Sequence, residues 1–305
     1  MEEKLEIPSV IERFSISMKY LESKILPCII VPIYRLPLTL DEEQSLCFLE
    51  KHLGNYPRVI VAPRSLGRWN LLKYGSQVSL WDDSRFSSVE SYSQLLMSED
   101  FYEEYSTWSH LLIYQLDCLI FRDELIQWCA SPWDYLGAPW FHNFNLEKVE
   151  KGLWAVGNGG LSLRRTAAFL KVLRTAAHEG IYQNPYLFPH YGLLPDERNQ
   201  PDAQRGLYHK MLTAFEKVSL TNPLWNVSQE IQRYMYNEDA FWSFEAMKFD
   251  PDFQIPPVEE ALKFAFEMNP SWCFVKNEKQ LPFGCHAWGR YDRSFWEQII
   301  ANESV

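Results

Sequence analysis

The sequence has 305 residues, of which 47% are hydrophobic and 15% aromatic, so it can bury a large core. Its formal net charge of -11 at pH 7 argues against a nucleic-acid backbone or an anionic membrane as the main partner, because both attract positively charged proteins. The six cysteines are scattered and never at CxxC spacing, so we expect reduced and mostly buried thiols.

The first residues, 1–24, predict an N-terminal extension that is acidic and broken by polar side chains. They lack the basic stretch followed by an apolar stretch that is typical of a secretory signal. No segment approaches the length of about 18 apolar residues that a membrane span requires, so we expect no transmembrane segment. We therefore expect a cytoplasmic protein, either free or peripherally attached to a membrane.

The first half of the chain alternates between strand and helix patterns. The run PCIIVPIYR, residues 27–35, predicts a strand leading into a loop, and residues 41–54 predict a helix that ends at Gly54. Further strands are predicted at 58–63, 77–83 and 110–121, and further helices at 91–108 and 123–131. This alternation is typical of an α/β domain with a largely parallel sheet, in which ligands bind at the carboxyl ends of the strands.

The second half is less regular. The motifs WDYLGAPWF (133–141) and VGNGGLSLRR (156–165) precede a predicted helix at 166–177, and helical patterns return at 236–249 and 256–267. Residues 178–206 show no period, which predicts either a long ordered loop or an irregular surface insertion. No repeat and no linker-like segment divides the chain, so we predict a single domain.

Gln115 and Asp117 interrupt the apolar run HLLIYQLDCLIF, residues 110–121. Within a strand both side chains would face the same side of the sheet, near its carboxyl end. Asp117 could bind a hard divalent cation that accompanies a diphosphate, or it could cap the next helix or pair with an arginine. The sequence leaves both alternatives open.

Three more groups could carry chemistry. Gly159 and Gly160 would let the backbone approach a ligand or form a bulge, although a tight turn explains them equally well. Glu238 and Asp239 could supply a general base or simply cap a helix. His286 could bind a metal or be a hydrogen-bonded structural residue. Zinc-hydrolase motifs, GxGxxG and the P-loop are all absent from the sequence.

Seven segments follow one another in a set order, namely IIVPIYR, SQLLMSEDFYEEYSTWSHLLIYQLDCLIFRDEL, WDYLGAPWF, VGNGGLSLRR, NEDAFW, FAFE and PFGCHAW. Together they resemble a family of mainly bacterial and viral proteins that is classed as a domain of unknown function and regarded as GT-A-type glycosyltransferases. The resemblance implies a GT-A-like, Rossmann-like domain at 25–301, with a mostly parallel sheet flanked by helices. Residues 25–125 would form its nucleotide-binding half and residues 126–301 its donor-sugar and acceptor half.

More distantly, YQLDCLIF is similar to the DxD strand of GT-A enzymes, and GNGGLSL followed by NED is similar to motifs of β-1,3-galactosyltransferases and Fringe-like enzymes. The resemblance implies that Asp117 and His286 bind a Mn²⁺ or Mg²⁺ ion, and that Asp239, with Glu238 beside it, acts as the base. It also implies a set of donor-binding residues: Pro32, Tyr34, Arg35, Arg64, Gln115, Asp117, Trp140, Asn158, Gly159 and Gly160.

The chain departs from the DxD pattern because Gln115 stands where the first acid is expected. An amide is a weaker ligand for these cations than a carboxylate, since it brings no charge. A metal-independent enzyme would instead bind the phosphates through arginines, for which four are candidates: Arg35, Arg64, Arg68 and Arg164.

The sequence thus predicts a glycosyltransferase of polysaccharide biosynthesis. It would move a sugar, with inversion, from a nucleotide-diphosphate sugar such as a UDP-sugar to a hydroxyl of a glycan or lipid-linked acceptor. Two alternatives remain, a non-catalytic carbohydrate-binding or assembly protein and a nucleotidyltransferase. Neither the identity of the sugars nor the oligomeric state can be predicted from the sequence.

Overall fold

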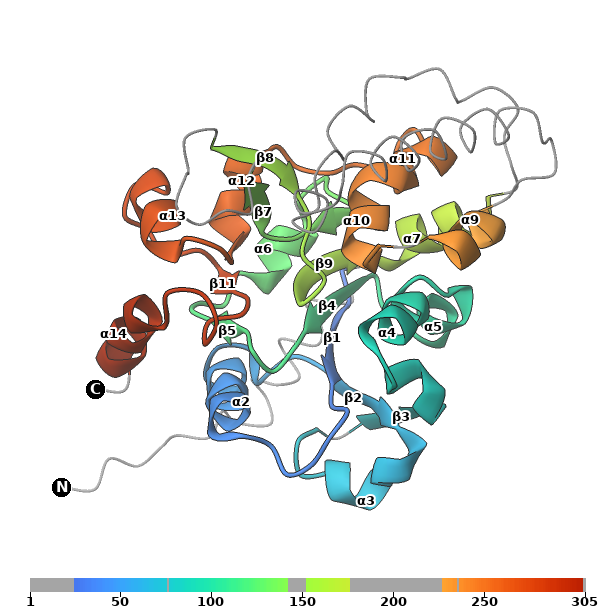
Figure 1. Cartoon of the computed structure of the whole chain (residues 1–305), viewed down its shortest axis with the longest axis horizontal. Coiled ribbons are helices and arrows are strands. Elements are labelled where there is room, and N and C mark those ends of the chain that lie inside the picture. The colour runs from blue at the N-terminus through green and yellow to red at the C-terminus, as the bar shows by residue number, and fades with distance from the viewer. Residues whose placement is uncertain (1–24, 76, 142–151, 176–226, 235, 304–305) are drawn as a thin grey trace, which may run out of the picture.

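A computed structural model describes residues 25–75, 77–141, 152–175, 227–234 and 236–303 (Figure 1). The predicted N-terminal extension and the 178–206 segment lie outside these residues. The central sheet has six strands in the order β3-β2-β1-β4-β9-β6. They are β1 (Pro27–Pro32), β2 (Arg58–Pro63), β3 (Gln77–Trp81), β4 (His110–Tyr114), β6 (Tyr135–Leu136) and β9 (Leu161–Arg165).

Most of this sheet is parallel. Strand β1 pairs in parallel with both β2 and β4, and β2 pairs in parallel with β3, whereas β9 runs antiparallel to β4 and β6. The chain builds outward from β1 to β3 and then returns to the other side of β1 to form β4. Ligands of open α/β sheets bind at such a reversal, outside the carboxyl ends of the strands. The predicted fold class is confirmed.

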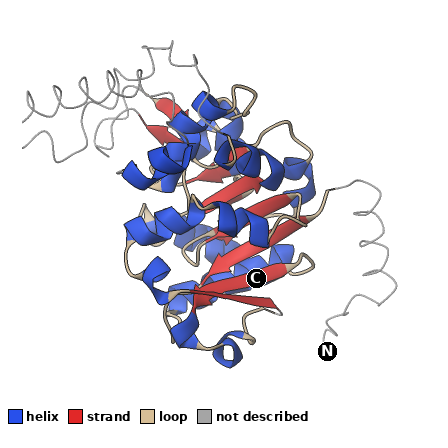
Figure 2. Ribbon diagram, turned by 90° about the vertical axis from the view of Figure 1, so that its right-hand side faces the viewer, coloured by secondary structure: helices blue, strands red, loops and turns tan. Residues whose placement is uncertain are grey.

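Both faces of the sheet are covered, which explains why its strands are continuous apolar runs. In β1, Ile29 and Val31 join one core cluster, while Cys28 and Ile30 join the cluster on the other face. Helices α2 (Leu40–Leu53) and α6 (Leu125–Cys129) pack on the first face. The second face is covered by α4 (Val89–Leu96), α5 (Glu99–Glu104), α7 (Thr166–Leu173), α9 (Val227–Arg233) and the helical segment 238–249 (Figures 1 and 2).

Smaller elements complete the second half of the domain. A three-stranded sheet joins β10 (Ala265–Phe266), β11 (Gly284–Cys285) and β5 (Leu119–Ile120), and a hairpin joins β7 (Pro139–Phe141) to β8 (Leu153–Val156). The helices around them are α12 (Val258–Phe264), α13 (Pro270–Lys276) and α14 (Arg293–Glu303). Strand β11 lies beside β5, so the C-terminal segment is brought next to the residues that follow β4.

Two predicted elements are each divided in the structure. The predicted strand 110–121 ends at Tyr114, where the chain turns and later forms β5 in a different sheet. Gln115 and Asp117 therefore lie in a turn and do not share one face of a strand. The predicted helix 91–108 is also two helices, because the Ser98 side chain accepts a hydrogen bond from the Phe101 amide and begins α5 there.

The cysteines are reduced and mostly buried, as their spacing predicted. All six are free, and only Cys47 is exposed. Among the described residues, no helix combines the length and the apolar character that crossing a bilayer demands.

Replacing Leu112 with alanine should lower the free energy of unfolding by about 2–5 kcal/mol, because this side chain is fully buried at the centre of the sheet and leaves a cavity. Leu40, which is 83% exposed, provides the control, and Leu40→Ala should change stability by less than about 0.5 kcal/mol. Urea unfolding measures both. Equal losses in the two variants would contradict this assignment of the core.

Candidate functional site

A cavity of about 730 Å³ opens at the carboxyl ends of β1 and β4, where the strand order reverses. Five segments line it. They are the loop after β1 (32–42), the start of α4 (86–93), the turn after β4 (115–117), the glycine loop between β8 and β9 (158–160) and the start of the helical segment (237–239). Glu267, His286 and Arg290 complete the wall. The cavity thus collects side chains from both halves of the domain.

Most of the residues predicted for the site line this cavity. They are Pro32, Tyr34, Arg35, Gln115, Asp117, Asn158, Gly159, Gly160, Glu238, Asp239 and His286. Two predicted donor-binding residues do not line it. Arg64 is exposed and lies 3.7 Å from Asp82, and Trp140 packs against Phe244 with 5.8 Å between the ring centroids.

The turn after β4 places Asp117 at the cavity wall. The Gln115 amide donates to the carbonyl of Gly160 at 2.9 Å, and the Cys118 amide closes the turn by donating to the Gln115 carbonyl at 3.0 Å. The Asp117 carbonyl accepts from the Trp288 amide at 3.2 Å. The side chain of Asp117 is 52% exposed. Backbone bonds on both sides therefore fix the turn while the carboxylate stays available to a ligand.

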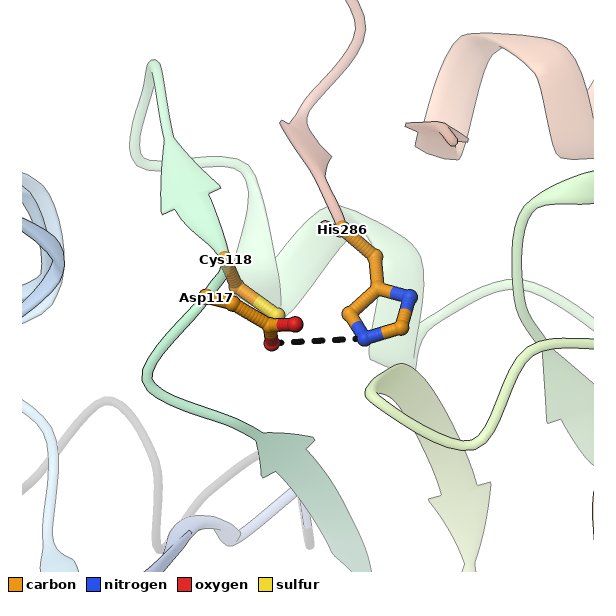
Figure 3. Close-up of side chains that lie close together, drawn as sticks. All are labelled: Asp117, Cys118 and His286. Atoms are coloured by element: carbon orange, nitrogen blue, oxygen red, sulfur yellow. Dashed lines mark ion pairs between the residues drawn. The ribbon is translucent and has the colours of Figure 1, made fainter. Parts of the chain in front are cut away.

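His286 follows β11 and points at Asp117 (Figure 3). Its Nε2 lies 3.3 Å from Oδ1 of Asp117, and its Nδ1 lies 3.0 Å from Oε1 of Glu267. Burial lowers the pKa of His286, but the hydrogen bonds to the two carboxylates outweigh burial and raise the pKa to about 10. Without a bound cation, the imidazole is therefore protonated and donates to both carboxylates.

Asn158, Gly159 and Gly160 form a tight loop that lines the cavity. Asn158 has a positive φ of 84°, and its Oδ1 accepts hydrogen bonds from the amides of Gly160 and Leu161. A Cβ on Gly159 would collide with the carboxylate of Glu238, and a Cβ on Gly160 would collide with the ring of His286. Both glycines are thus required by close approach of side chains, a reason that the sequence alone could not give.

Glu238 is held by a buried ion pair. Its Oε1 lies 3.0 Å from Nη2 of Arg164, whose side chain is fully buried, and its Oε2 accepts from the Ser93 hydroxyl at 3.4 Å. The Arg164 guanidinium also donates to Tyr102 and Ser162. Arg164 is therefore not a phosphate-binding residue of the cavity, contrary to the metal-independent alternative.

Asp239 lies beside this pair on the cavity wall. Burial, together with the charges of Glu238 and Glu267, raises the pKa of Asp239 to about 7. The carboxylate accepts one hydrogen bond from the Ala240 amide at 2.8 Å. A carboxyl group with such a pKa can exchange a proton with a bound molecule near neutral pH.

Several lining residues were not singled out from the sequence. Glu267 lines the cavity and is the last residue of the FAFE motif. A carboxylate directly after an apolar run could have indicated a site residue at this position. Arg290 and Tyr92 carried no such signal. Of the four arginines considered for phosphate binding, only Arg35 lines the cavity, and it is bound to Glu42 at 3.0 Å.

The side chains around Asp117 fit a divalent cation. Asp117, Cys118 and His286 each place one ligand atom within 4.8 Å of the others. The 3.3 Å between Asp117 Oδ1 and His286 Nε2 suits two neighbouring ligands of one ion at about 2.1–2.3 Å. Burial raises the pKa of the Cys118 thiol well above its ordinary value, and the thiol donates to the Gly160 carbonyl. The thiol therefore stays protonated, and Asp117 and His286 are the two side chains of this group that fit a cation.

The family is established by sequence. A family model described as "Protein of unknown function (DUF5672)" matches residues 75–286, a range that runs from β3 to His286. The chain belongs to this family. The resemblance inferred from the motifs is thereby confirmed at the level of the family, while the similarity to Fringe-like enzymes stays a prediction. No curated protein matches the chain.

Solved structures give distant likenesses. The glycosyltransferase GlyE of Streptococcus pneumoniae TIGR4 is 10% identical, with a TM-score of 0.41, and the match covers 92% of this chain and 63% of GlyE. Its apo form is 11% identical, with a TM-score of 0.39 and coverages of 91% and 62%. A cytidylyltransferase from Leptospira borgpetersenii serovar Hardjo-bovis (strain JB197) is 11% identical, with a TM-score of 0.30 and coverages of 48% and 63%. The chain spans less than two thirds of each of these proteins.

Replacing Arg164 with methionine should cost about 3–5 kcal/mol of stability, because Glu238 would be left buried without its charged partner. Adding Glu238→Gln should recover part of that loss, since the unpaired charge is then removed as well. Urea unfolding of the two single variants and the double variant measures this coupling.

Arg174 is a matched control, because its guanidinium pairs with Glu99 and Glu103 at the surface and its side chain is 49% exposed. Arg174→Met should cost less than about 1 kcal/mol. If the Arg164 double variant were as unstable as the sum of its single variants, the two side chains would not be coupled and the description of the pair would be wrong.

Proposed function

We propose that this protein is a glycosyltransferase that moves a sugar from a UDP-sugar to a hydroxyl group of a glycan or lipid-linked acceptor, with inversion at the anomeric carbon. One observation carries the proposal: the same cavity is lined by Asp239, with its raised pKa, and by the Asp117–His286 pair. A base and a diphosphate anchor within one cavity are the two parts that this reaction needs. The motif resemblance supports the same assignment.

In the proposed reaction, Asp239 accepts the proton of the acceptor hydroxyl. The hydroxyl oxygen then forms a bond to the anomeric carbon, and the bond between that carbon and the diphosphate oxygen breaks. Asp117 and His286 would hold the divalent cation, which stabilises the negative charge of the departing diphosphate. Glu238 stays bound to Arg164 and fixes the position of Asp239, so its role is positioning.

The charges along the cavity support a cation. Six carboxylates line it, from Asp41, Glu42, Asp117, Glu238, Asp239 and Glu267. Among the described residues, Arg35 and Arg290 are the only arginines or lysines in the lining, and Arg35 is bound to Glu42. Neither Asp117 nor Asp239 forms an ion pair with a described lysine or arginine, so these two carboxylates would repel a diphosphate unless a bound cation neutralised part of their charge. The metal-dependent form of the mechanism therefore has more support than the metal-independent one.

Asp239→Asn should lower the transfer rate by about 10²–10⁴-fold while leaving the affinity for the UDP-sugar nearly unchanged, because the amide keeps the shape but cannot accept the proton. The wild-type rate should rise with pH through about 7, since the base works in its deprotonated form. The variant should lose this rise. Release of UDP measures the rate, and calorimetry measures donor affinity.

Asp252→Asn is the control for this experiment, because Asp252 is 91% exposed and lies outside the cavity. It should match the wild type in rate and in pH profile. Normal transfer by Asp239→Asn would refute the base assignment. Release of pyrophosphate from a nucleoside triphosphate, with no UDP released from any UDP-sugar, would instead identify a nucleotidyltransferase.

Glu267→Gln should weaken Mn²⁺ binding in the presence of UDP by about 10–100-fold, although Glu267 is not itself placed as a ligand. Its carboxylate holds Nδ1 of His286 at 3.0 Å and thereby orients Nε2 toward Asp117. Calorimetric titration with Mn²⁺ measures the affinity directly. Glu260→Gln, at a surface glutamate paired with Lys263, is the control and should bind Mn²⁺ like the wild type. Equal Mn²⁺ affinity in Glu267→Gln and wild type would rule out this orienting role.

A further inference from the structure

Exposed apolar side chains gather on one edge of the molecule. Six large hydrophobic residues of the described part are exposed, and five of them follow the carboxyl ends of β1, β2 and β3. These five are Tyr34 at 58%, Leu40 at 83%, Trp69 at 85%, Leu72 at 37% and Val89 at 63%. Because neighbouring parallel strands end at the same edge of a sheet, the three segments that carry them belong to one surface.

We call residues 33–40, 64–75 and 82–89 the sheet-edge surface. The Ser65 amide donates to the Asp83 carboxylate at 3.1 Å and joins the second segment to the third. The Ile33 amide donates to the Val61 carbonyl of β2 at 2.9 Å, so the first segment begins beside the strand that leads into the second. Figure 1 shows the loop after β1 and the short helix α3 (Arg68–Leu71) together at the lower edge of the molecule.

One segment of this surface has a charge opposite to that of the whole chain, whose net charge is -11. Residues 64–75 carry Arg64, Arg68 and Lys73 and no acidic residue. The other two segments are not basic overall, because Asp41, Glu42 and Glu43 directly follow the first and the third holds Asp82 and Asp83. An otherwise acidic protein thus presents a basic segment, 64–75, that an anionic surface can attract.

The mixture of aromatic and basic side chains on this surface favours a lipid bilayer over a protein as the partner. Lys73 Nζ lies 4.6 Å from the ring centroid of Tyr74, and the Arg35 guanidinium carbon lies 5.8 Å from that of Tyr34. Trp69 stands between Arg68 and Asn70 and is almost fully exposed. Tryptophan, tyrosine and basic residues mixed on one surface are typical of proteins that lie in the headgroup region of a bilayer. A protein interface would more often show a contiguous apolar centre with few charges.

The surface also continues into the cavity. Tyr34, Arg35 and Val89 belong to the sheet-edge surface and line the cavity at the same time. A bilayer in contact with this edge would lie at the mouth of the cavity.

We propose that the sheet-edge surface docks this protein on an anionic lipid bilayer, with Trp69 and Leu72 entering the headgroup region and Arg68 and Lys73 contacting lipid phosphates. The docking goes beyond the proposed function and does not need it. Only the purpose that we assign to docking rests on the proposed function: a docked protein would have a lipid-linked acceptor next to its cavity.

Vesicle flotation tests the docking with the full chain. The wild type should float with vesicles that contain phosphatidylglycerol and phosphatidylcholine, and binding should weaken when salt is added, because the attraction is partly electrostatic. The double variant Trp69→Ser, Lys73→Glu should bind these vesicles at least about fiftyfold more weakly, since it removes the interfacial aromatic and reverses one charge.

The matched control changes the same kinds of residue on another face. Val275 is 66% exposed and Lys276 follows it at the end of α13, which Figure 1 places far from α3. The variant Val275→Ser, Lys276→Glu alters the net charge by the same amount and should bind vesicles within about threefold of the wild type. Both double variants should keep the wild-type melting temperature and UDP-sugar affinity, because none of the four residues lines the cavity.

Three outcomes would overturn the docking. In the first, the wild type does not bind anionic vesicles, and in the second, the Trp69→Ser, Lys73→Glu variant binds them as the control does. In the third, the wild type is a dimer without lipid and only this variant is a monomer, which would assign the surface to a second copy of the chain. Vesicle binding without any UDP-sugar turnover would instead contradict the proposed function and leave the docking surface intact.

Discussion

The buried ion pair between Arg164 and Glu238 is the constraint on which the geometry of the cavity depends. A fully buried guanidinium is tolerated only because Glu238, Tyr102 and Ser162 all accept its hydrogen bonds. The pair ties β9 in the central sheet to the start of the helical segment at 238. Asp239 is the next residue, so the same pair fixes it at the cavity wall, where burial and the neighbouring carboxylates raise its pKa.

The glycine loop lies between this ion pair and His286. Gly159 leaves room for the Glu238 carboxylate, and Gly160 leaves room for the ring of His286. Asn158 holds the loop in place by accepting from two of its amides. One short loop therefore packs against both Glu238 and His286. A side chain at Gly159 would displace Glu238 and one at Gly160 would displace His286, which explains the two adjacent glycines between strands.

The sheet was predictable because strands buried on both faces are continuous apolar runs, and their alternation with amphipathic helices is a local pattern. The turn at 115–117 was missed because residues 118–121 are apolar too, so periodicity cannot separate one long strand from two short ones. The ion pair between Arg164 and Glu238 could not be predicted from a local pattern either, because the two residues are 74 positions apart along the chain. Trp140 was placed in the site by its motif and Arg64 by its position directly after a predicted strand, whereas side-chain contacts decide where both lie.

The charge balance of the cavity gives a physical reason for an uncharged residue at position 115, which the comparison with the DxD motif does not. Among the cavity carboxylates, four have basic partners: Asp41 with Arg293, Glu42 with Arg35, Glu238 with Arg164 and Glu267 with His286. Asp117 shares His286, and Asp239 has no basic partner among the described residues. A second acid at position 115 would add uncompensated charge next to Asp117. With a neutral amide there, the proposed cation site has few charged protein ligands, so diphosphate oxygens would supply much of its coordination and the cation would bind together with the donor.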